Sequence, residues 1–297
     1  MSNEQIYRVI ERFANKYPIT AMAKFYQVST SGFYAWKNRK KEDKDIELLN
    51  MIKECQEKNK KLLGYRRVRL WLQKEKGINV NKKRILRVMR QNNLLSKIRR
   101  KRVFSLKMGN ANKYENILNR NFASAQPNEK WVSDISEIST PNGKVFLSAI
   151  KDLYDDFIVS HVMADRQTYP LVDRTIKLAT SHEKTKAETI LHTDGGGQYR
   201  SKKYKEQTKE NNITPSMSAP GTPGDNSPAE NFFSTLKTEC IYLENPRDPN
   251  EAIEMVEEYI QYYCYERIQQ DGKTPWERRS KWYEENGMSL SHNSPGK

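Results

Sequence analysis

The sequence predicts an α/β protein in which all-α units precede a mixed-sheet core. Apolar residues recur at helical spacing through the first 95 residues, whereas alternating and continuous apolar runs typical of strands begin at Trp131. Charge divides in a similar way. Residues 1–125 hold 31 Lys and Arg against 10 Asp and Glu, and the remaining 172 residues hold 21 against 27. The two changes together predict a basic helical half joined to an acidic α/β half.

Length and composition narrow the class of protein. A chain of 297 residues suits two or three domains with at least one sizeable core. The mean hydropathy of −0.92, the lack of a long apolar run and the N-terminal composition predict neither a membrane span nor a signal peptide, so we expect a soluble, cytoplasmic protein. Cys55, Cys240 and Cys264 are too scattered for a disulfide framework or a zinc site, and we interpret them as packing residues.

Residues 1–41 are predicted to form the first helical unit. A helix at the N-terminus ends at Pro18, a second short helix follows, and the turn 29–32 supplies hydroxyl groups that cap a third. A short helix, a tight turn and a basic helix are typical of a helix-turn-helix unit that binds DNA. A small packing or dimerisation domain has the same pattern, so both interpretations remain open.

Residues 42–95 are predicted to form a connector helix and a second helix-turn-helix-like unit. Gly64 ends the connector, and Asn81 is placed to cap the last helix, which has one apolar and one basic face. No acidic residue occurs between Lys76 and Arg102, which favours DNA over a merely solvated surface. The DNA-binding residues predicted here are Arg66, Arg67, Lys82, Lys83, Arg84, Arg87 and Arg90.

Residues 96–128 are predicted to be a basic linker. The run 97–107 contains no acid, and the polar stretch after it has low hydrophobicity. Such a segment can follow a DNA backbone through long-range charge attraction without reading the sequence. The predicted DNA contacts in the linker are Arg99, Arg100, Lys101 and Arg102.

From residue 129 to 245 the pattern predicts a sheet flanked by helices, and 246–297 a helical extension and tail. A hairpin turn at 141–143 separates the first two strands. Three antiparallel strands, then alternating helices and strands, are consistent with a mixed sheet. The expected strands cover 131–140, 144–154, 157–166, 188–194 and 213–218, and the expected helices cover 169–183, 201–211 and a long segment from about 226.

Three carboxylates in this half form the candidate site. Asp134 lies within the first expected strand, Asp194 ends a buried strand before three glycines, and Glu230 lies one turn into the last helix. If the two strands are neighbours, both aspartates lie at one edge of the sheet. Two ions of Mg²⁺ or Mn²⁺, which prefer oxygen ligands, can drive phosphodiester chemistry between such carboxylates. We therefore predict that all three residues are catalytic and bind metal.

Other polar residues surround these acids. Lys237 lies two turns beyond Glu230 on nearly the same helix face, where it can contact a phosphate. His192 shares a strand face with Asp194, so it either borders the site or is a core histidine. The remaining acids of this region, Asp152, Asp155 and Asp165, are interpreted as turn or strand-edge residues.

The motifs WVSDIS, LHTDGGGQYRS and DNSPAENFFSTLKTE resemble the catalytic core of retroviral integrase-type DDE transposases, and more narrowly the OrfB transposases of the insertion-sequence-three family. The segments STSGFYAWKNR, GYRRVRLWL and YIQYYCYERIQQ also resemble family segments in the expected order, so the resemblance covers nearly the whole chain. It implies an RNase H-like core and Mg²⁺ dependence. Asp134, Asp194 and Glu230 match the metal-binding triad, and Asn226 and Lys237 match supporting positions near it.

The resemblance also implies an activity and its partners. It implies binding to the terminal inverted repeats of an element, generation of a 3′-OH and transfer of that strand into double-stranded target DNA. Joining two DNA ends implies a homo-oligomer on DNA. Members of the family are often fused by frameshifting to a short upstream helix-turn-helix protein, and they act in the bacterial cytoplasm at the nucleoid.

The chain departs from the family pattern at several positions. Gly224 and Ser227 replace a larger aromatic residue and an alanine, and Ala219–Pro220 stands where basic residues are common. Cys264 replaces an expected asparagine, and the loop after Gln270 is shortened. Two alternatives therefore stay open: a catalytically impaired or repurposed transposase that acts as a DNA-binding regulator, and a general RNase H-like nuclease.

Overall fold

The computed structural model describes residues 2–38, 45–96, 114–183 and 188–288. Contacts between residues divide the chain into two units, Met1–Lys53 and Glu54–Lys297. The division falls inside a helix instead of at the expected boundary near residue 41. None of the described helices is both long and apolar enough to cross a membrane.

The first unit contains the expected short helices around a small core. Ser2 caps the first helix through a capping box with Gln5, which satisfies two backbone N–H groups at the helix start. Ile10 and Phe33 are fully buried against each other's helices, so the apolar periodicity of this segment is used for packing within the unit. The helices are α1 (Asn3–Phe13), α2 (Ile19–Phe25) and α3 (Thr30–Asn38).

Three further helices form the second helix-turn-helix-like segment. Gly77 ends α5 in the left-handed conformation with a φ of 67°, and Asn81 caps α6 by accepting a hydrogen bond from the backbone N–H of Lys83 at 2.8 Å. The side-chain amide of Gln56 donates to the carbonyls of Leu63 and Leu94, which closes the unit. The helices are α4 (Ile46–Lys58), α5 (Tyr65–Lys76) and α6 (Lys82–Gln91).

The core is a five-stranded mixed sheet with the strand order β3-β2-β1-β4-β5. β1 pairs antiparallel with β2 and β2 antiparallel with β3, whereas β1, β4 and β5 are parallel. This arrangement confirms the expected mixed sheet. The strands are β1 (Lys130–Thr140), β2 (Gly143–Asp152), β3 (Ile158–Ala164), β4 (Thr189–Thr193) and β5 (Ile213–Met217).

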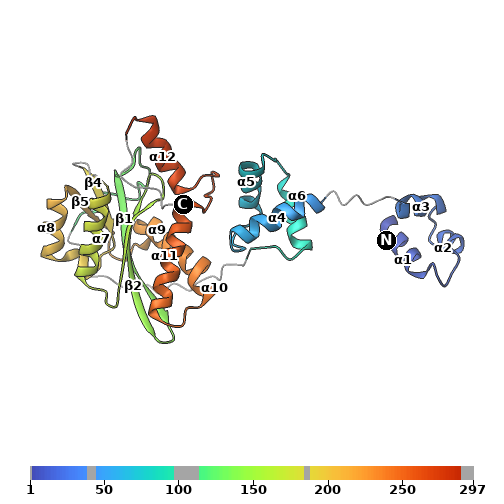
Figure 1. Cartoon of the computed structure of the whole chain (residues 1–297), viewed down its shortest axis with the longest axis horizontal. Helices are drawn as coiled ribbons and strands as arrows, with labels where there is room; N and C mark the ends of the chain where they lie inside the picture. The colour runs from blue at the N-terminus through green and yellow to red at the C-terminus, as the bar shows by residue number, and fades with distance from the viewer. Residues whose placement is uncertain (1, 39–44, 97–113, 184–187, 289–297) are drawn as a thin grey trace. The chain divides into compact units, whose positions relative to one another are not determined.

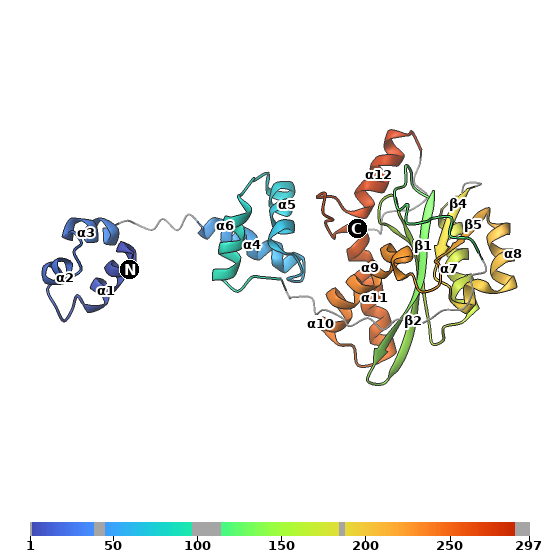
Figure 2. The ribbon, with the colours of Figure 1, turned by 180° about the vertical axis from the view of Figure 1, so that it is seen from behind.

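Helices cover both faces of this sheet (Figures 1 and 2). Trp131 and Leu191 pack towards α7 (Tyr169–His182) and α8 (Lys202–Glu210), whereas Ile138 packs with residues of the opposite face. Alternation of side chains along β1 thus supplies both cores. The opposite face is covered by α9 (Ser227–Leu236) and α11 (Pro249–Tyr265).

The core includes two segments of the chain that were expected to lie outside it. Helix α11 was expected in a C-terminal extension, yet its Val256 and Ile260 are buried in the same cluster as Phe232 of α9. The segment after residue 114 was expected to be linker, yet Leu118 is buried against Val132. The apolar residues of α11 recur at helical spacing, but spacing alone does not show which element that face packs against, and Leu118 is an isolated apolar residue in polar sequence.

The expected long helix from about residue 226 is confirmed, because residues 227–244 are continuously helical with a π-helical turn in the middle. A π-helical turn, η3 (Lys237–Ile241), follows α9 directly and leads into the short α10 (Tyr242–Glu244). Asn245, with a φ of 53°, then ends the helix. Two 3₁₀ turns precede these elements, η1 (Gly197–Arg200) and η2 (Pro223–Asn226).

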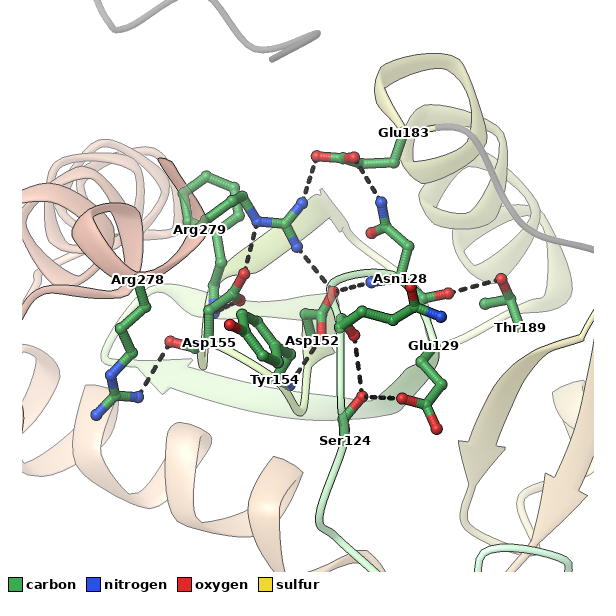
Figure 3. A network of polar contacts seen from close by, with 12 residues as sticks. Ser124, Asn128, Glu129, Asp152, Tyr154, Asp155, Glu183, Thr189, Arg278 and Arg279 are labelled. Carbon is green, nitrogen blue, oxygen red and sulfur yellow. Dashed lines mark hydrogen bonds and ion pairs between the residues drawn. The ribbon is translucent and has the colours of Figure 1, made fainter. Parts of the chain in front are cut away.

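The last helix, α12 (Pro275–Glu285), is held by a buried ionic cluster (Figure 3). The fully buried guanidinium of Arg279 lies 2.8 Å from Asp152, 2.9 Å from Asp155 and 2.5 Å from Glu183. Asn128 donates to two of these acids, through its backbone N–H to Asp152 and its side chain to Glu183. Asp152 ends β2 and Asp155 lies in the turn after it, as expected, and both are in addition buried ion-pair partners of Arg279.

Candidate active site

Asp134 and Asp194 lie on neighbouring parallel strands. Ser133 of β1 is the register partner of Thr193 of β4, and the two aspartates are the next residue on each strand. Adjacent strands are about 4.8 Å apart, so the two backbones bring the carboxylates to one place. The expectation that these strands are neighbours is confirmed.

Glu230 approaches the same face of the sheet from α9. Val132, which shares a strand face with Asp134, packs against Ala229, the residue before Glu230. Phe233 and Leu236, expected on the buried flank of the helix, are buried. The packing of α9 thus places a glutamate from its first turn beside the two aspartates.

The three carboxylates share an unfavourable electrostatic environment. Burial and then the charge of Asp194 raise the pKa of Asp134 to about 8, although a hydrogen bond from the Ile135 N–H opposes the shift. Burial also raises the pKa of Asp194. For Glu230 burial and the charge of Asp194 both raise the pKa. Three negative charges therefore oppose one another here, which a bound cation would reverse.

The donor set fits a hard divalent cation. Asp134 accepts a hydrogen bond from the Ile135 N–H and Asp194 one from the Gly196 N–H, and among the described residues none donates to Glu230. The oxygens left over are the ligands that Mg²⁺ and Mn²⁺ prefer. In the part of the chain that the structure describes, no three His, Cys, Asp or Glu side chains are yet close enough together to hold an ion.

One glycine of the DGGGQY motif is required by the site. A Cβ on Gly196 would lie 2.9 Å from the Asp194 carboxylate and 2.8 Å from the Gln198 amide. A Cβ on Gly197 would meet nothing within 4 Å. Of these two glycines, Gly196 is the one whose backbone lies close to the Asp194 carboxylate.

His192 matches the core-histidine alternative. Its ring is fully buried, with Nδ1 2.9 Å from the Ser216 hydroxyl and Nε2 3.0 Å from the Ser218 hydroxyl. Burial lowers the pKa of His192 to about 4, so the ring is neutral at physiological pH. Both ring nitrogens are occupied, and His192 supports the site by joining β4 to β5.

The two remaining supporting residues lie near the triad. The side-chain amide of Asn226, just before α9, donates to the Ser133 carbonyl at 3.1 Å. Lys237 is half-buried on the π-helical turn, where its positive charge favours the ionised form of Asp134.

Sequence reasoning missed Tyr199 of η1. It is fully buried, with its hydroxyl 3.4 Å from the Ser133 hydroxyl. Burial and then the charges of Asp134 and Asp194 place its pKa well above the ordinary value, so it is a neutral polar group beside the acids. Its position in the DGGGQY motif was the available signal.

The predicted DNA-binding residues fall into three groups. Arg67 was predicted to contact DNA. Its half-buried guanidinium lies 3.7 Å from Glu239 of the core and forms an ion pair with it. Arg99, Arg100, Lys101 and Arg102 lie outside the described residues. The other predicted residues are exposed on α5 and α6, namely Arg66, Lys82, Lys83, Arg84, Arg87 and Arg90.

The departures at 224 and 264 are accommodated in the structure. Gly224 is exposed, and a Cβ there would lie 3.6 Å from Arg120, an ordinary contact. Cys264 is buried in the core of α11. Neither position opens a defect beside the triad.

The strand order and the helices on both faces define an RNase H-like core, in which Asp134 and Asp194 directly follow register partners of two neighbouring strands. Family comparison agrees: residues 124–223 and 211–270 match models described as integrase core domain, and residues 42–102 match an HTH-like domain. The chain belongs to the transposases of insertion sequence elements, in the insertion-sequence-three family.

The relatives that establish this family are similar over most of their length. The putative transposase InsK of element IS150 from Escherichia coli K12 is 34% identical over 279 residues, or 93% of this chain and 98% of the relative. The IS600 31 kDa protein of Shigella sonnei is 34% identical over 82% of this chain and 90% of its own length. The transposase InsF of IS3A from Escherichia coli K12 is 31% identical over 80% and 85%.

A solved structure, the HTLV-2 integrase catalytic core domain in complex with magnesium, is 17% identical and covers 52% of this chain and 98% of that one. Its TM-score is 0.42, a similarity too weak to add to the family assignment.

Proposed function

We propose that the protein is a DNA transposase that binds the terminal inverted repeats of its element and catalyses metal-dependent strand cleavage and strand transfer. Three acids support the proposal: Asp134 and Asp194 directly follow register partners of neighbouring strands, and Glu230 of α9 lies near enough for the charge of Asp194 to raise its pKa. Such a site would be unfavourable in a purely DNA-binding protein, because no function would offset the cost of placing three like charges together.

Asp134, Asp194 and Glu230 would hold two ions of Mg²⁺ or Mn²⁺. When bound, the ions neutralise charge on the phosphate and stabilise the attacking and leaving oxygens. In cleavage, the oxygen of water forms a bond to phosphorus and the 3′ oxygen leaves as a 3′-OH. In strand transfer, that 3′-OH attacks a phosphorus of the target and displaces its 3′ oxygen.

The other residues of the chain would bind and orient DNA. Lys237, close to the triad, is placed to contact a phosphate next to the reacting one. The exposed basic side chains of α6 and the basic run that follows it would hold the DNA backbone. Asn226 and His192 would keep the elements that carry the acids in register.

The proposal extends to the assembly. Joining two DNA ends to one target requires at least two active sites, so the protein would act as a homo-oligomer on DNA. A fusion with a short upstream helix-turn-helix protein and association with the nucleoid belong to the same proposal.

The test uses the purified chain with a DNA fragment that ends in the inverted repeat flanking its gene. We expect a new 3′-OH at the repeat end and joined products, both dependent on Mg²⁺ and abolished by EDTA. Equal cutting of random DNA would instead indicate a general nuclease. Repeat binding without any metal-dependent product would indicate a regulator.

A further inference from the structure

The loop of residues 218–226, here called the bridging loop, connects β5 to the helix that carries Glu230. Its first residue, Ser218, donates its backbone N–H to the Thr193 carbonyl at 2.9 Å. Its last residue, Asn226, donates its side-chain amide to the Ser133 carbonyl at 3.1 Å. Thr193 and Ser133 are the residues directly before Asp194 and Asp134. The bridging loop is therefore attached at both ends to the two strands that carry the other acids.

Asn226 does not have the ordinary role of its position. Asparagine at the N-cap usually accepts a hydrogen bond from a backbone N–H in the first turn of the helix. At α9 the side chain of Asn226 caps nothing and is turned to β1 instead. The side chain therefore holds the start of α9 to β1.

Asp225 closes the bridging loop. Its buried carboxylate accepts from the Thr222 hydroxyl at 2.6 Å and from the Ala219 N–H at 3.2 Å, both within the loop. It also accepts from the Asn116 amide at 2.9 Å and from Arg120 Nε at 2.6 Å. Burial opposes ionisation, but the hydrogen bonds outweigh it and hold the pKa of Asp225 below its ordinary value.

Arg120 lies in a turn with an unusual backbone conformation. Asn119 and Arg120 both lie in the left-handed region, with φ values of 42° and 60°, which residues other than glycine rarely adopt. The Asn119 N–H donates to the Asn116 side chain, which fixes the turn. The Arg120 side chain is 60% exposed, so its contact with Asp225 orients the loop and does not serve to bury the arginine.

We propose that Asp225, held by Arg120, is a positioning residue that sets the place of Glu230 relative to Asp134 and Asp194 and so tunes the affinity of the site for a divalent cation. Asp225 touches no reacting atom and acts through the bridging loop. The inference rests on the proposed function for its catalytic consequence, but not for its consequence for metal binding.

The experiment compares Arg120→Ala and Asp225→Asn with the wild-type full chain. Three quantities are measured: the Mn²⁺ concentration at the midpoint of thermal stabilisation, the Kd for repeat DNA in Ca²⁺, and the Mg²⁺ concentration that gives half-maximal cleavage. Loss of a group that orients metal ligands weakens metal binding by about 10-fold or more. We expect both metal midpoints to rise by about 10-fold while the Kd for DNA stays within about twofold.

Two controls separate positioning from general stability. Arg247→Ala removes an exposed arginine that lies 3.7 Å from Glu251, and should leave both metal midpoints unchanged. Arg120→Lys retains a cation that can reach Asp225 and should restore most of the metal affinity. If Asp225→Asn does not fold, Arg120→Ala decides, since its side chain lies largely in solvent.

The outcomes are distinguishable. Unchanged metal midpoints in Arg120→Ala, or a lower Tm with no shift in either midpoint, would overturn the inference. A wild-type chain that binds Mn²⁺ but cleaves no repeat DNA would overturn the proposed function, and a raised Mn²⁺ midpoint in the variants would then still support the positioning role.

Discussion

Two groups of three acidic residues lie near opposite ends of β4, and the protein treats their charge in different ways. Asp194 of the catalytic group follows the last residue of β4. At the other end, the side chain of Thr189, the first residue of β4, donates a hydrogen bond to the backbone carbonyl of Asn128, which contacts two acids of the second group. In the second group the acids Asp152, Asp155 and Glu183 surround the buried guanidinium of Arg279 (Figure 3). Arg279 is thus a built-in cation that contacts all three acids, whereas at the catalytic group the charges of Lys237 and Arg200 favour the ionised forms of Asp134 and Asp194 but do not outweigh burial.

The comparison shows what distinguishes a structural cluster from a reactive one. Arg279 supplies one positive charge to its three acids and joins α12 to the sheet, and burial still raises the pKa values of Asp152 and Asp155. Burial raises the pKa values of the catalytic acids too, and the charge of Asp194 adds to the shift at Asp134 and Glu230. The catalytic group would need cations from solution, whereas the second group already contains Arg279. Four predictions follow from this contrast, in order of decreasing effect.

The largest effect is expected for removal of a catalytic charge. Asp194→Asn and Glu230→Gln should lower single-turnover cleavage by about 1,000-fold or more, because several kcal/mol of metal-dependent stabilisation are lost. Repeat-DNA affinity, measured by fluorescence anisotropy, should stay within about twofold. Undiminished strand transfer by either variant in Mg²⁺ would contradict the assignment.

Removal of the built-in cation should affect stability. Arg279→Met removes the guanidinium that pairs with three buried carboxylates and should lower the free energy of unfolding by about 3–5 kcal/mol, measured by urea denaturation. Arg247→Ala, an exposed control, should change it by less than about 0.5 kcal/mol. A loss below about 1 kcal/mol for Arg279→Met would show that the cluster does not hold α12 in place.

Bound metal should stabilise the folded protein through the catalytic group and not through the acids around Arg279. At a concentration 100 times its Kd, Mn²⁺ should raise the free energy of unfolding by about 2.7 kcal/mol, and EDTA should reverse the gain. Asp194→Asn should lose most of this gain in the same thermal scan. An equal gain in that variant would place the bound ion elsewhere.

The smallest effect concerns pH without metal. Because the folded pKa of Asp134 is raised to about 8, folding favours its protonated form. The free energy of unfolding attributable to Asp134 therefore falls as pH rises from its ordinary pKa towards 8 and is constant above that. The stability of Asp134→Asn relative to the wild type should increase between pH 6 and pH 8 in EDTA. A difference independent of pH would contradict the raised pKa.

Much of the core was predictable because local pattern and tertiary packing agree. Alternation along 131–140 and the turn at 141–143 predicted β1 and β2, and the expectation that the strands before Asp134 and Asp194 are neighbours is confirmed. The residues that surround the acids were harder to predict. Polar side chains are expected at the surface, and nothing local shows that Arg120 reaches Asp225, 105 positions away.

The same limit applies to the second acidic group. Arg279 contacts Asp152 across 127 positions of sequence, so no periodicity links them. Arg67 was grouped with the basic residues predicted to bind DNA, because its ion-pair partner Glu239 lies far away in the sequence. Long-range charge pairing is a property of the folded chain, and the sequence shows only its separate members.

The position of Arg279 has a consequence for synthesis of the protein on the ribosome. Asp152, Asp155 and Glu183 are translated long before the arginine that neutralises them, so a nascent chain interrupted before residue 279 would carry three acids without their counter-ion. Such a fragment would leave α12 undocked and its acids accessible to water, which marks it for proteolysis. The ionic cluster around Arg279 is therefore completed only once α12 has been translated.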